Sequence, residues 1–275
     1  RADQWADIVI GETRDGFGFV LEGEVNDLGY QAIATPGSLK AYFEAQTTWG
    51  EKDWDEVVAP AIDWAEKGFV VRPHVAGWWV EGASMGRADN GARLRNSATG
   101  RDIYFRSDGS IKRVGDVVVN KDLAKTLQLI ASDGADVFYS GRLAERMADD
   151  ISAHGGLMDD NDLRNYRTTH NEPIRSAYRG LDIATNHPPG GGVMVLEMLN
   201  ILEHFDLTAM GHNSVDYVRT VTETMKRATS DKDTYVGDPE HFDVPLERLI
   251  SKAHAAEHAA AIQAGERATV ERLAY

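Results

Sequence analysis

The stretch from Tyr178 to Asp206 reads YRGLDIATNHPPGGGVMVLEMLNILEHFD and indicates three consecutive elements. Apolar side chains alternate with polar ones over residues 181–185, which predicts a short strand. Two prolines and three glycines then break the chain, and a strongly apolar helix follows. Glycines lack Cβ atoms, so backbone N–H groups at such a break can approach a ligand closely and hold an anion. We therefore expect one wall of a ligand site at Pro189, Gly190, Gly191 and Gly192.

The composition limits the kinds of partner. The chain has 275 residues, of which 42% are hydrophobic, and it carries a formal charge of −15. This length and composition are sufficient for a large buried core, and the acidity argues against binding to nucleic acid or to an anionic membrane surface. No apolar run approaches 18 residues, so we expect a soluble protein without a membrane span, either periplasmic or cytoplasmic. Cysteine is absent, which excludes disulfides, thiolate nucleophiles and cysteine-based zinc sites.

The order of predicted elements indicates a helix-rich α/β protein whose strands are too short for a doubly wound sheet. Apolar spacing and capping residues predict the helices, and turn residues bound the strands. We interpret the polar segment 87–101 as a flexible surface excursion. Helices are expected over 39–47, from 53 to 65 with a kink or a fresh start at Pro60, from 120 to 134, from 143 to 155, after Ser214, and over 252–263. Strands are expected over 8–10, 17–21, 173–177 and 181–185.

Several short blocks occur in the same order as in one known family. Together they cover roughly residues 35 to 252, and an ordered set is more specific than any single motif. On these residues the chain resembles the large subunit of the gamma-glutamyltransferase family of N-terminal-nucleophile hydrolases. The blocks are Thr35-Pro36-Gly37-Ser38, residues 55–62 (DEVVAPAI), 65–69 (AEKGF), 123–127 (LAKTL), 134–139 (GADVFY), 155–157 (GGL), 178–180 (YRG), 199–203 (LNILE) and 237–239 (GDP).

The resemblance implies a four-layer αββα fold, of which residues 1–275 form the large-subunit half as a single domain. It also implies a threonine nucleophile whose own α-amine acts as the base, so the precursor must cleave itself to expose that threonine. Residue 1 here is Arg1, and the chain ends at Tyr275, about where similar large subunits end. We therefore expect no catalytic residue on this chain and a small-subunit partner, from the same precursor, that begins with threonine. The expected substrate is a small amide or gamma-glutamyl compound, and no metal or organic cofactor is needed.

Two departures from the family pattern bear on the substrate. Relatives hold the substrate α-carboxylate with an arginine that, by spacing, falls several residues before Arg1. Many relatives also read Pro-Pro-Pro-Ser-Ser-Gly-Gly, whereas residues 186–192 here read NHPPGGG, so two serine hydroxyls are missing. The acyl group can therefore be gamma-glutamyl or a different one, such as glutaryl or an oxamate amide.

Two rival functions belong to other classes. His254, Glu257 and His258 match H-x-x-E-H, in which two histidines on one helix face hold zinc and the glutamate acts as base; a further ligand would come from Glu266 or Glu271. Alternatively, the chain is a non-catalytic binding scaffold.

Three residues and motifs near these sites have simpler interpretations. The glycine triplet lacks the lysine and hydroxyl of a nucleotide P-loop, so it can equally be a tight turn that permits close packing. We interpret His187 as a hydrogen-bonding loop residue. We interpret Asp231 as a buried structural partner of Lys232 or of backbone N–H groups.

Overall fold

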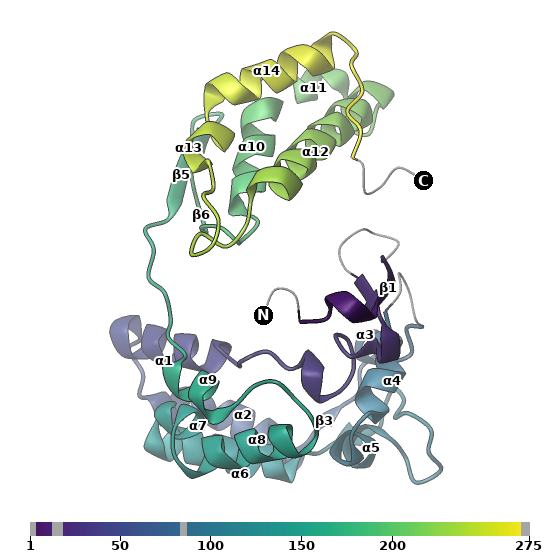
Figure 1. Ribbon diagram of the computed structural model, residues 1–275, viewed down its shortest axis with the longest axis vertical. Helices are drawn as coiled ribbons and strands as arrows, with labels where there is room; N and C mark the ends of the chain where they lie inside the picture. The colour runs from purple at the N-terminus through teal and green to yellow at the C-terminus, as the bar shows by residue number, and fades with distance from the viewer. Residues whose placement is uncertain (1–3, 13–18, 83–86, 271–275) are drawn as a thin grey trace. The chain divides into compact units, whose positions relative to one another are not determined.

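The computed structural model describes residues 4–12, 19–82 and 87–270, and their contacts cluster in two compact units, residues 1–168 and 169–275 (Figure 1). Helices dominate both units, and strands occur only as three two-stranded antiparallel sheets in the described part of the chain. The expected helix-rich character and the absence of a doubly wound sheet are therefore confirmed for these residues. The expectation that residues 1–275 act as a single domain stays a prediction.

The first unit is built on helices that follow the predicted spacing. Asn120 caps α6 by accepting a hydrogen bond from the Leu123 backbone N–H, and α6 packs along α2. No fresh start occurs at Pro60, because α2 runs through this residue as one helix. The helices are α1 (Ser38–Trp49), α2 (Trp54–Lys67), α3 (Pro73–Trp79), α4 (Asn90–Arg95), α5 (Ala98–Tyr104), α6 (Lys121–Asp133), α7 (Asp136–Tyr139), α8 (Arg142–Ala153) and α9 (Asp160–Asn165); the strands are β1 (Val9–Glu12), β2 (Phe19–Leu21), β3 (Phe69–Val70) and β4 (Val117–Val118).

A tyrosine joins two of the family-like blocks in this unit. Tyr139 is buried, its hydroxyl donates to the Pro36 carbonyl at 2.5 Å, and it accepts from the Lys40 backbone N–H at 3.1 Å. A Cβ on Gly37 would lie 1.8 Å from the Tyr166 hydroxyl, so a larger residue there would displace the Tyr166 ring. These two blocks therefore meet by packing. The surrounding core consists of Tyr139, Ala144, Ile151, Met158 and Leu163.

The interpretation of residues 87–101 as a flexible excursion is wrong. This segment forms α4 and most of α5, and each helix has a side-chain cap: Asp89 accepts from Ala92 N–H and Ser97 from Gly100 N–H. An ion pair between Arg93 and Asp27 holds the segment to the preceding chain. Polar composition predicted a loop because the caps themselves are polar, and short capped helices carry few apolar residues.

The second unit begins with the predicted hairpin. Strands β5 (Ile174–Tyr178) and β6 (Leu181–Thr185) pair antiparallel from Ile174–Thr185 to Tyr178–Leu181. Arg179 and Gly180, the two residues between the strands, both have positive φ, at 49° and 81°. A two-residue turn with positive φ at both residues has a backbone twist that matches the right-handed twist of the flanking strands, so it is a favoured hairpin turn.

Helix α10 is the centre of this unit. It packs against the hairpin and against α12, α13 and α14, as Figure 1 shows for the helices. A helix that is apolar on most sides belongs in a core. Its neighbours begin close to the predicted positions, and Ser214 and Ser251 cap α12 and α14. The helices are α10 (Gly192–Leu202), α11 (Leu207–Met210), α12 (Val215–Tyr235), α13 (Leu246–Leu249) and α14 (Lys252–Gln263).

No helix in the described ranges combines the length and the apolar character that crossing a bilayer requires.

Candidate functional site

The predicted break between strand and helix is present, and we call residues 186–191 the elbow. Strand β6 ends at Thr185, the chain turns through a cis peptide bond between Pro188 and Pro189, and α10 begins at Gly192. Pro188 is buried, whereas Pro189 is exposed. The elbow therefore joins the end of a strand to the N-terminus of the central helix of the unit.

Two of the three glycines are required by packing. A Cβ on Gly192 would lie 2.5 Å from the Asn186 carbonyl oxygen and 2.5 Å from Thr185 Oγ1. A Cβ on Gly190 would lie 1.9 Å from Asn186 Nδ2, whereas a Cβ on Gly191 would meet nothing within 4 Å. None of the three glycines has a positive φ. The close-packing interpretation of the triplet therefore accounts for Gly190 and Gly192, and Gly191 is left exposed at the surface.

A hollow of about 610 Å³ lies beside the elbow. Pro189 and Gly190 line it, whereas Gly191 and Gly192 are not among its lining residues. His187 also lines the hollow, and its Nε2 contacts the carbonyl oxygen of Glu172, as expected for a hydrogen-bonding loop residue. The N-terminus of α10 has no side-chain cap, and uncapped N–H groups at a helix N-terminus favour an anion. The remaining lining residues are Thr169, Asn171, Pro173, Ala184, Thr185, Asn186 and Pro188.

A second group of polar side chains lies within the same unit, and we call it the α10 cluster: Glu197, Asp231, His254 and His258. Glu197 comes from α10, Asp231 from α12, and the two histidines from one face of α14, because residues four apart on a helix are neighbours. The ligand-type atoms of all four side chains lie within 4.8 Å of one another. Glu197 is 1% exposed and His254 is 9% exposed, so the group is largely removed from water.

Electrostatic effects in the α10 cluster shift the pKa values of its two carboxyl groups in opposite directions. Burial raises the pKa of Glu197 to about 9, and the negative charge of Asp231 adds to this effect. Burial would also raise the pKa of Asp231, but hydrogen bonds from His258 and His254 outweigh it and lower that pKa. The two carboxyl groups thus differ in their preferred protonation, as expected when two acids share a buried site.

The cluster corrects two predictions from the sequence. Glu257 is 81% exposed, and its nearest carboxylate oxygen lies 4.0 Å from His254 Nδ1. The other members of the cluster face the opposite ring nitrogen of His254, Nε2. The zinc-peptidase arrangement is therefore wrong in the role that it gives to Glu257. Glu266 is not a member of the cluster, and Glu271 lies outside the described residues. The interpretation of Asp231 missed its two imidazole partners, and Lys232 pairs with Asp233 at 2.8 Å.

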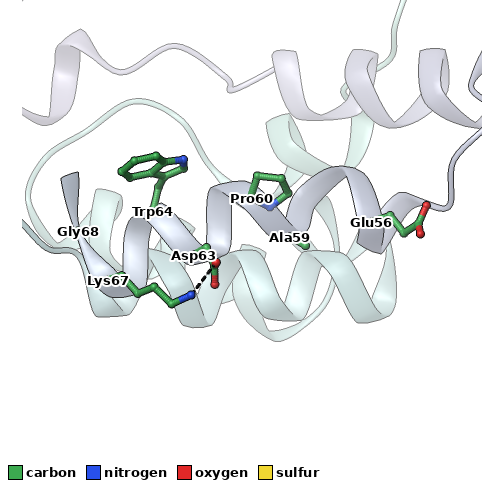
Figure 2. Close-up of a pocket in the computed structure, with 7 residues that line it drawn as sticks. All are labelled: Glu56, Ala59, Pro60, Asp63, Trp64, Lys67 and Gly68. Atoms are coloured by element: carbon green, nitrogen blue, oxygen red, sulfur yellow. Dashed lines mark hydrogen bonds and ion pairs between the residues drawn. The ribbon is translucent and has the colours of Figure 1, made fainter. Parts of the chain in front are cut away.

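A hollow in the first unit, also about 610 Å³, has little chemistry to offer. Its lining comes from α2 and Gly68, with Pro60 and Trp64 projecting from the helix and Asp63 paired to Lys67 at 2.7 Å (Figure 2). A surface formed by one helix, whose only cation is already paired, lacks converging polar groups. The elbow hollow is therefore the better candidate for a small-molecule site.

Comparison with known families and proteins gives a consistent result. The model of the gamma-glutamyltranspeptidase family matches residues 13–274. The acylase ACY 1 proenzyme of Pseudomonas sp. (strain SE83) is 37% identical over 255 residues, which are 92% of this chain and 43% of that protein. The glutathione hydrolase proenzyme of Bacillus subtilis (strain 168) is 37% identical over 220 residues, which are 80% of this chain and 36% of that protein. This chain therefore spans less than half the length of these relatives.

Solved structures agree with the sequence comparison. The gamma-glutamyltranspeptidase of Helicobacter pylori has a TM-score of 0.82 at 28% identity, covering 92% of this chain and 70% of that chain. The cephalosporin acylase from Bacillus halodurans has a TM-score of 0.74 at 30% identity, covering 85% of this chain and 42% of that chain.

Proposed function

Because this chain belongs to the gamma-glutamyltranspeptidase family and covers its large-subunit region, we propose that the mature protein is an acyl-transferring amide hydrolase. Its fold is that of the N-terminal-nucleophile hydrolases in this family. A second chain from the same precursor carries the N-terminal threonine and completes the four-layer αββα arrangement as one domain. The observation that carries this proposal is the match along nearly the whole chain, residues 13–274.

The proposed reaction proceeds through an acyl-enzyme. The threonine hydroxyl of the partner chain attacks the amide carbonyl, while the α-amine of the same threonine takes the hydroxyl proton. Backbone N–H groups stabilise the oxyanion, the amine leaves with a proton, and water or a second amine accepts the acyl group. Since this chemistry is carried on the partner, the role of the present chain is to shape the pocket.

The elbow is the part of this chain that we place next to the substrate. Pro189 and Gly190 line a hollow, and Gly191 is exposed with open space around it. Gly192 is buried against Asn186, so its contribution is the position of the α10 N-terminus. That N-terminus has no side-chain cap, which suits a carboxylate of the substrate. Pro189, Gly190, Gly191 and Gly192 thus form the proposed substrate wall.

The acyl group is either gamma-glutamyl or another acyl group of similar size. The gamma-glutamyl alternative is supported by the name of the matching family and by the glutathione hydrolase relative. The other alternative is supported by the acylase relatives and by the elbow, where NHPPGGG lacks both serine hydroxyls of the usual pattern. Fewer hydroxyl donors reduce the hydrogen bonding available to an α-amino-acid donor.

Intact-mass measurement and N-terminal sequencing of every chain in the purified full-length protein test the proposal. A second chain that begins with threonine is expected, and its Thr→Ala variant should remain an uncleaved precursor without activity. Hydrolysis of gamma-glutamyl-p-nitroanilide is then compared with hydrolysis of glutaryl-p-nitroanilide. A protein that is never cleaved, or that is cleaved but hydrolyses no amide, would instead be a binding scaffold.

The variant Pro189→Ser separates the two acyl groups. It restores one hydroxyl at an exposed position that lines the hollow. If the pocket is built for a donor without an α-amino group, kcat/KM for the gamma-glutamyl compound should rise relative to the glutaryl compound. The matched control is Pro73→Ser, which adds a hydroxyl at another exposed proline that does not line the hollow.

A further inference from the structure

The four side chains of the α10 cluster point their ligand-type atoms at one small volume. His254 Nε2 and His258 Nε2 are 3.2 Å apart, and Asp231 Oδ2 lies 2.5 Å and 3.3 Å from them. Glu197 Oε1 lies 3.8 Å and 3.7 Å from the same two nitrogens. A tetrahedral ion with ligands at 2.0–2.2 Å has ligand atoms about 3.4 Å apart. The five distances therefore bracket the edge of such a tetrahedron.

One atom of this group has an unmet requirement. Glu197 is only 1% exposed, and its Oε1 atom has no hydrogen-bond partner among the described residues. A buried polar atom without a partner is costly, so it calls for an explanation such as an ion. This largely buried group thus contains two carboxyl groups, from Glu197 and Asp231, and two imidazoles, which bind a metal ion in their neutral form.

A shared proton explains the arrangement less completely. A protonated Glu197 can hydrogen-bond Asp231, and the histidines can bond the same aspartate. Under that arrangement both imidazole Nε2 atoms still face each other, and Glu197 Oε1 still accepts nothing. The guanidinium of Arg248 also acts on Glu197, but it is stacked over Tyr235 at 4.4 Å from the ring centroid. A cation at the centre supplies a partner for all four ligand atoms at once.

We propose that Glu197, Asp231, His254 and His258 bind a zinc ion that ties α10, α12 and α14 together. Two imidazoles with two carboxylates suit zinc, whereas calcium and magnesium prefer oxygen ligands alone. Four protein ligands close a tetrahedral shell and leave no open position, which is the pattern of a structural site. His258 and Asp231 retain side-chain exposures of 20% and 15%, which leaves a route for the ion to enter. The site is independent of the proposed acyl transfer.

This site differs from a hydrolytic one that uses the H-x-x-E-H pattern. The glutamate of that pattern, Glu257, is exposed and lies on the Nδ1 side of His254. An outer carboxylate on that side orients a ligating histidine at most, and it does not reach the ion. Glu257→Gln is therefore the matched control, because it changes the same motif without removing a ligand.

The first test is zinc content in the untagged full protein with both subunits. After incubation with zinc and desalting, elemental analysis should find one zinc per large subunit in the wild type and in Glu257→Gln. His258→Gln and Glu197→Gln should each lower zinc affinity by at least about tenfold. His241→Gln controls for the exposed group Asp238, Glu240 and His241, and it should leave this zinc in place. Equal zinc in the wild type and His258→Gln would overturn the proposal.

Thermal unfolding gives a second readout, which does not use activity. At a zinc concentration about 100 times its Kd, the wild-type midpoint should rise by about 5–10 °C, and magnesium should leave it unchanged. His258→Gln should lose most of the zinc-dependent rise. A rise that is the same with magnesium, or the same in His258→Gln, would contradict the site.

Cobalt substitution covers the case in which a ligand variant does not fold. Wild-type protein loaded with Co²⁺ should show the intense visible bands of a tetrahedral ion, displaced by one equivalent of zinc. Thiolate bands are excluded in this chain because it has no cysteine. Weak octahedral bands, or no binding, would leave the proton-sharing arrangement as the correct description.

Discussion

The elbow and the α10 cluster use the same helix in opposite ways. The elbow lies at the N-terminus of α10, offers backbone N–H groups and a hollow, and carries no charged side chain. The cluster lies farther along α10, is largely buried, and consists only of titratable side chains from three helices. Burial of the middle of α10 against α12 and α14 fixes the helix in the core and so gives its open N-terminus a defined position.

The largest expected effect is at Gly192, where the elbow enters the helix. In Gly192→Ala the new Cβ lies 2.5 Å from the Asn186 carbonyl oxygen, and backbone cannot move aside cheaply. We expect a loss of about 3 kcal/mol in the free energy of unfolding. Gly191→Ala, with no neighbour within 4 Å, should change it by less than about 0.5 kcal/mol. Urea unfolding of both variants measures the difference, and equal losses would show that the elbow is not closely packed.

Asn200, three residues beyond Glu197, should show the next largest effect. It is fully buried, and its amide donates to the Ile250 carbonyl at 2.7 Å while its oxygen accepts from Lys252 at 2.7 Å. Asn200→Ala removes the donor to the Ile250 carbonyl, whereas Lys252 keeps Glu203 and the Ala177 carbonyl as acceptors, so we expect a loss of about 2 kcal/mol. Asn165→Ala, which removes an exposed hydrogen bond to Asn161, is the control and should cost far less.

Asn200→Ala also tests whether the buried hydrogen bonds of α10 and the proposed zinc site are independent of each other. Because Asn200 is not a ligand in the proposed site, zinc stoichiometry should stay at one in Asn200→Ala. If zinc is lost together with stability, the two features of the helix are a single cooperative unit.

His187 tests whether the elbow contributes chemistry or only shape. Its contact is with the Glu172 carbonyl, so His187→Ala should cost about 1 kcal/mol of stability and alter KM more than kcat. His187→Gln retains a hydrogen-bond donor and should restore most of both losses. Steady-state kinetics across pH are the measurement. If the Ala variant lost one limb of the pH profile, His187 would be an acid or base in the reaction.

The two regions also differ in how far the sequence predicted them. The sequence predicts the elbow because proline and glycine act locally, and local patterns of the same kind predict the hairpin and α14. His254 and His258 were paired correctly because i and i+4 spacing is local too. For Glu197 the sequence predicts only a place in an apolar helix, since no local pattern shows that a glutamate in such a helix is buried beside histidines from another one. Contacts between helices depend on packing, which one sequence does not display.

The smallest effect concerns Glu203, at the C-terminal end of α10. Its carboxylate pairs with Lys252 at 2.6 Å and accepts from the Arg179 backbone N–H at 2.7 Å, and these hydrogen bonds lower its pKa below the ordinary 4.5. A lowered folded-state pKa adds stability above pH 4.5, and this stability is lost as pH falls through the folded-state pKa. Glu203→Gln should therefore flatten the decline of unfolding free energy below pH 4.5 and change it only slightly near pH 7, because the pair is partly exposed. Urea unfolding at several pH values measures this slope. An unchanged slope would mean that the Glu203–Lys252 pair does not contribute to stability. A flatter slope with intact zinc binding would show that α10 is secured independently at its middle and at its end.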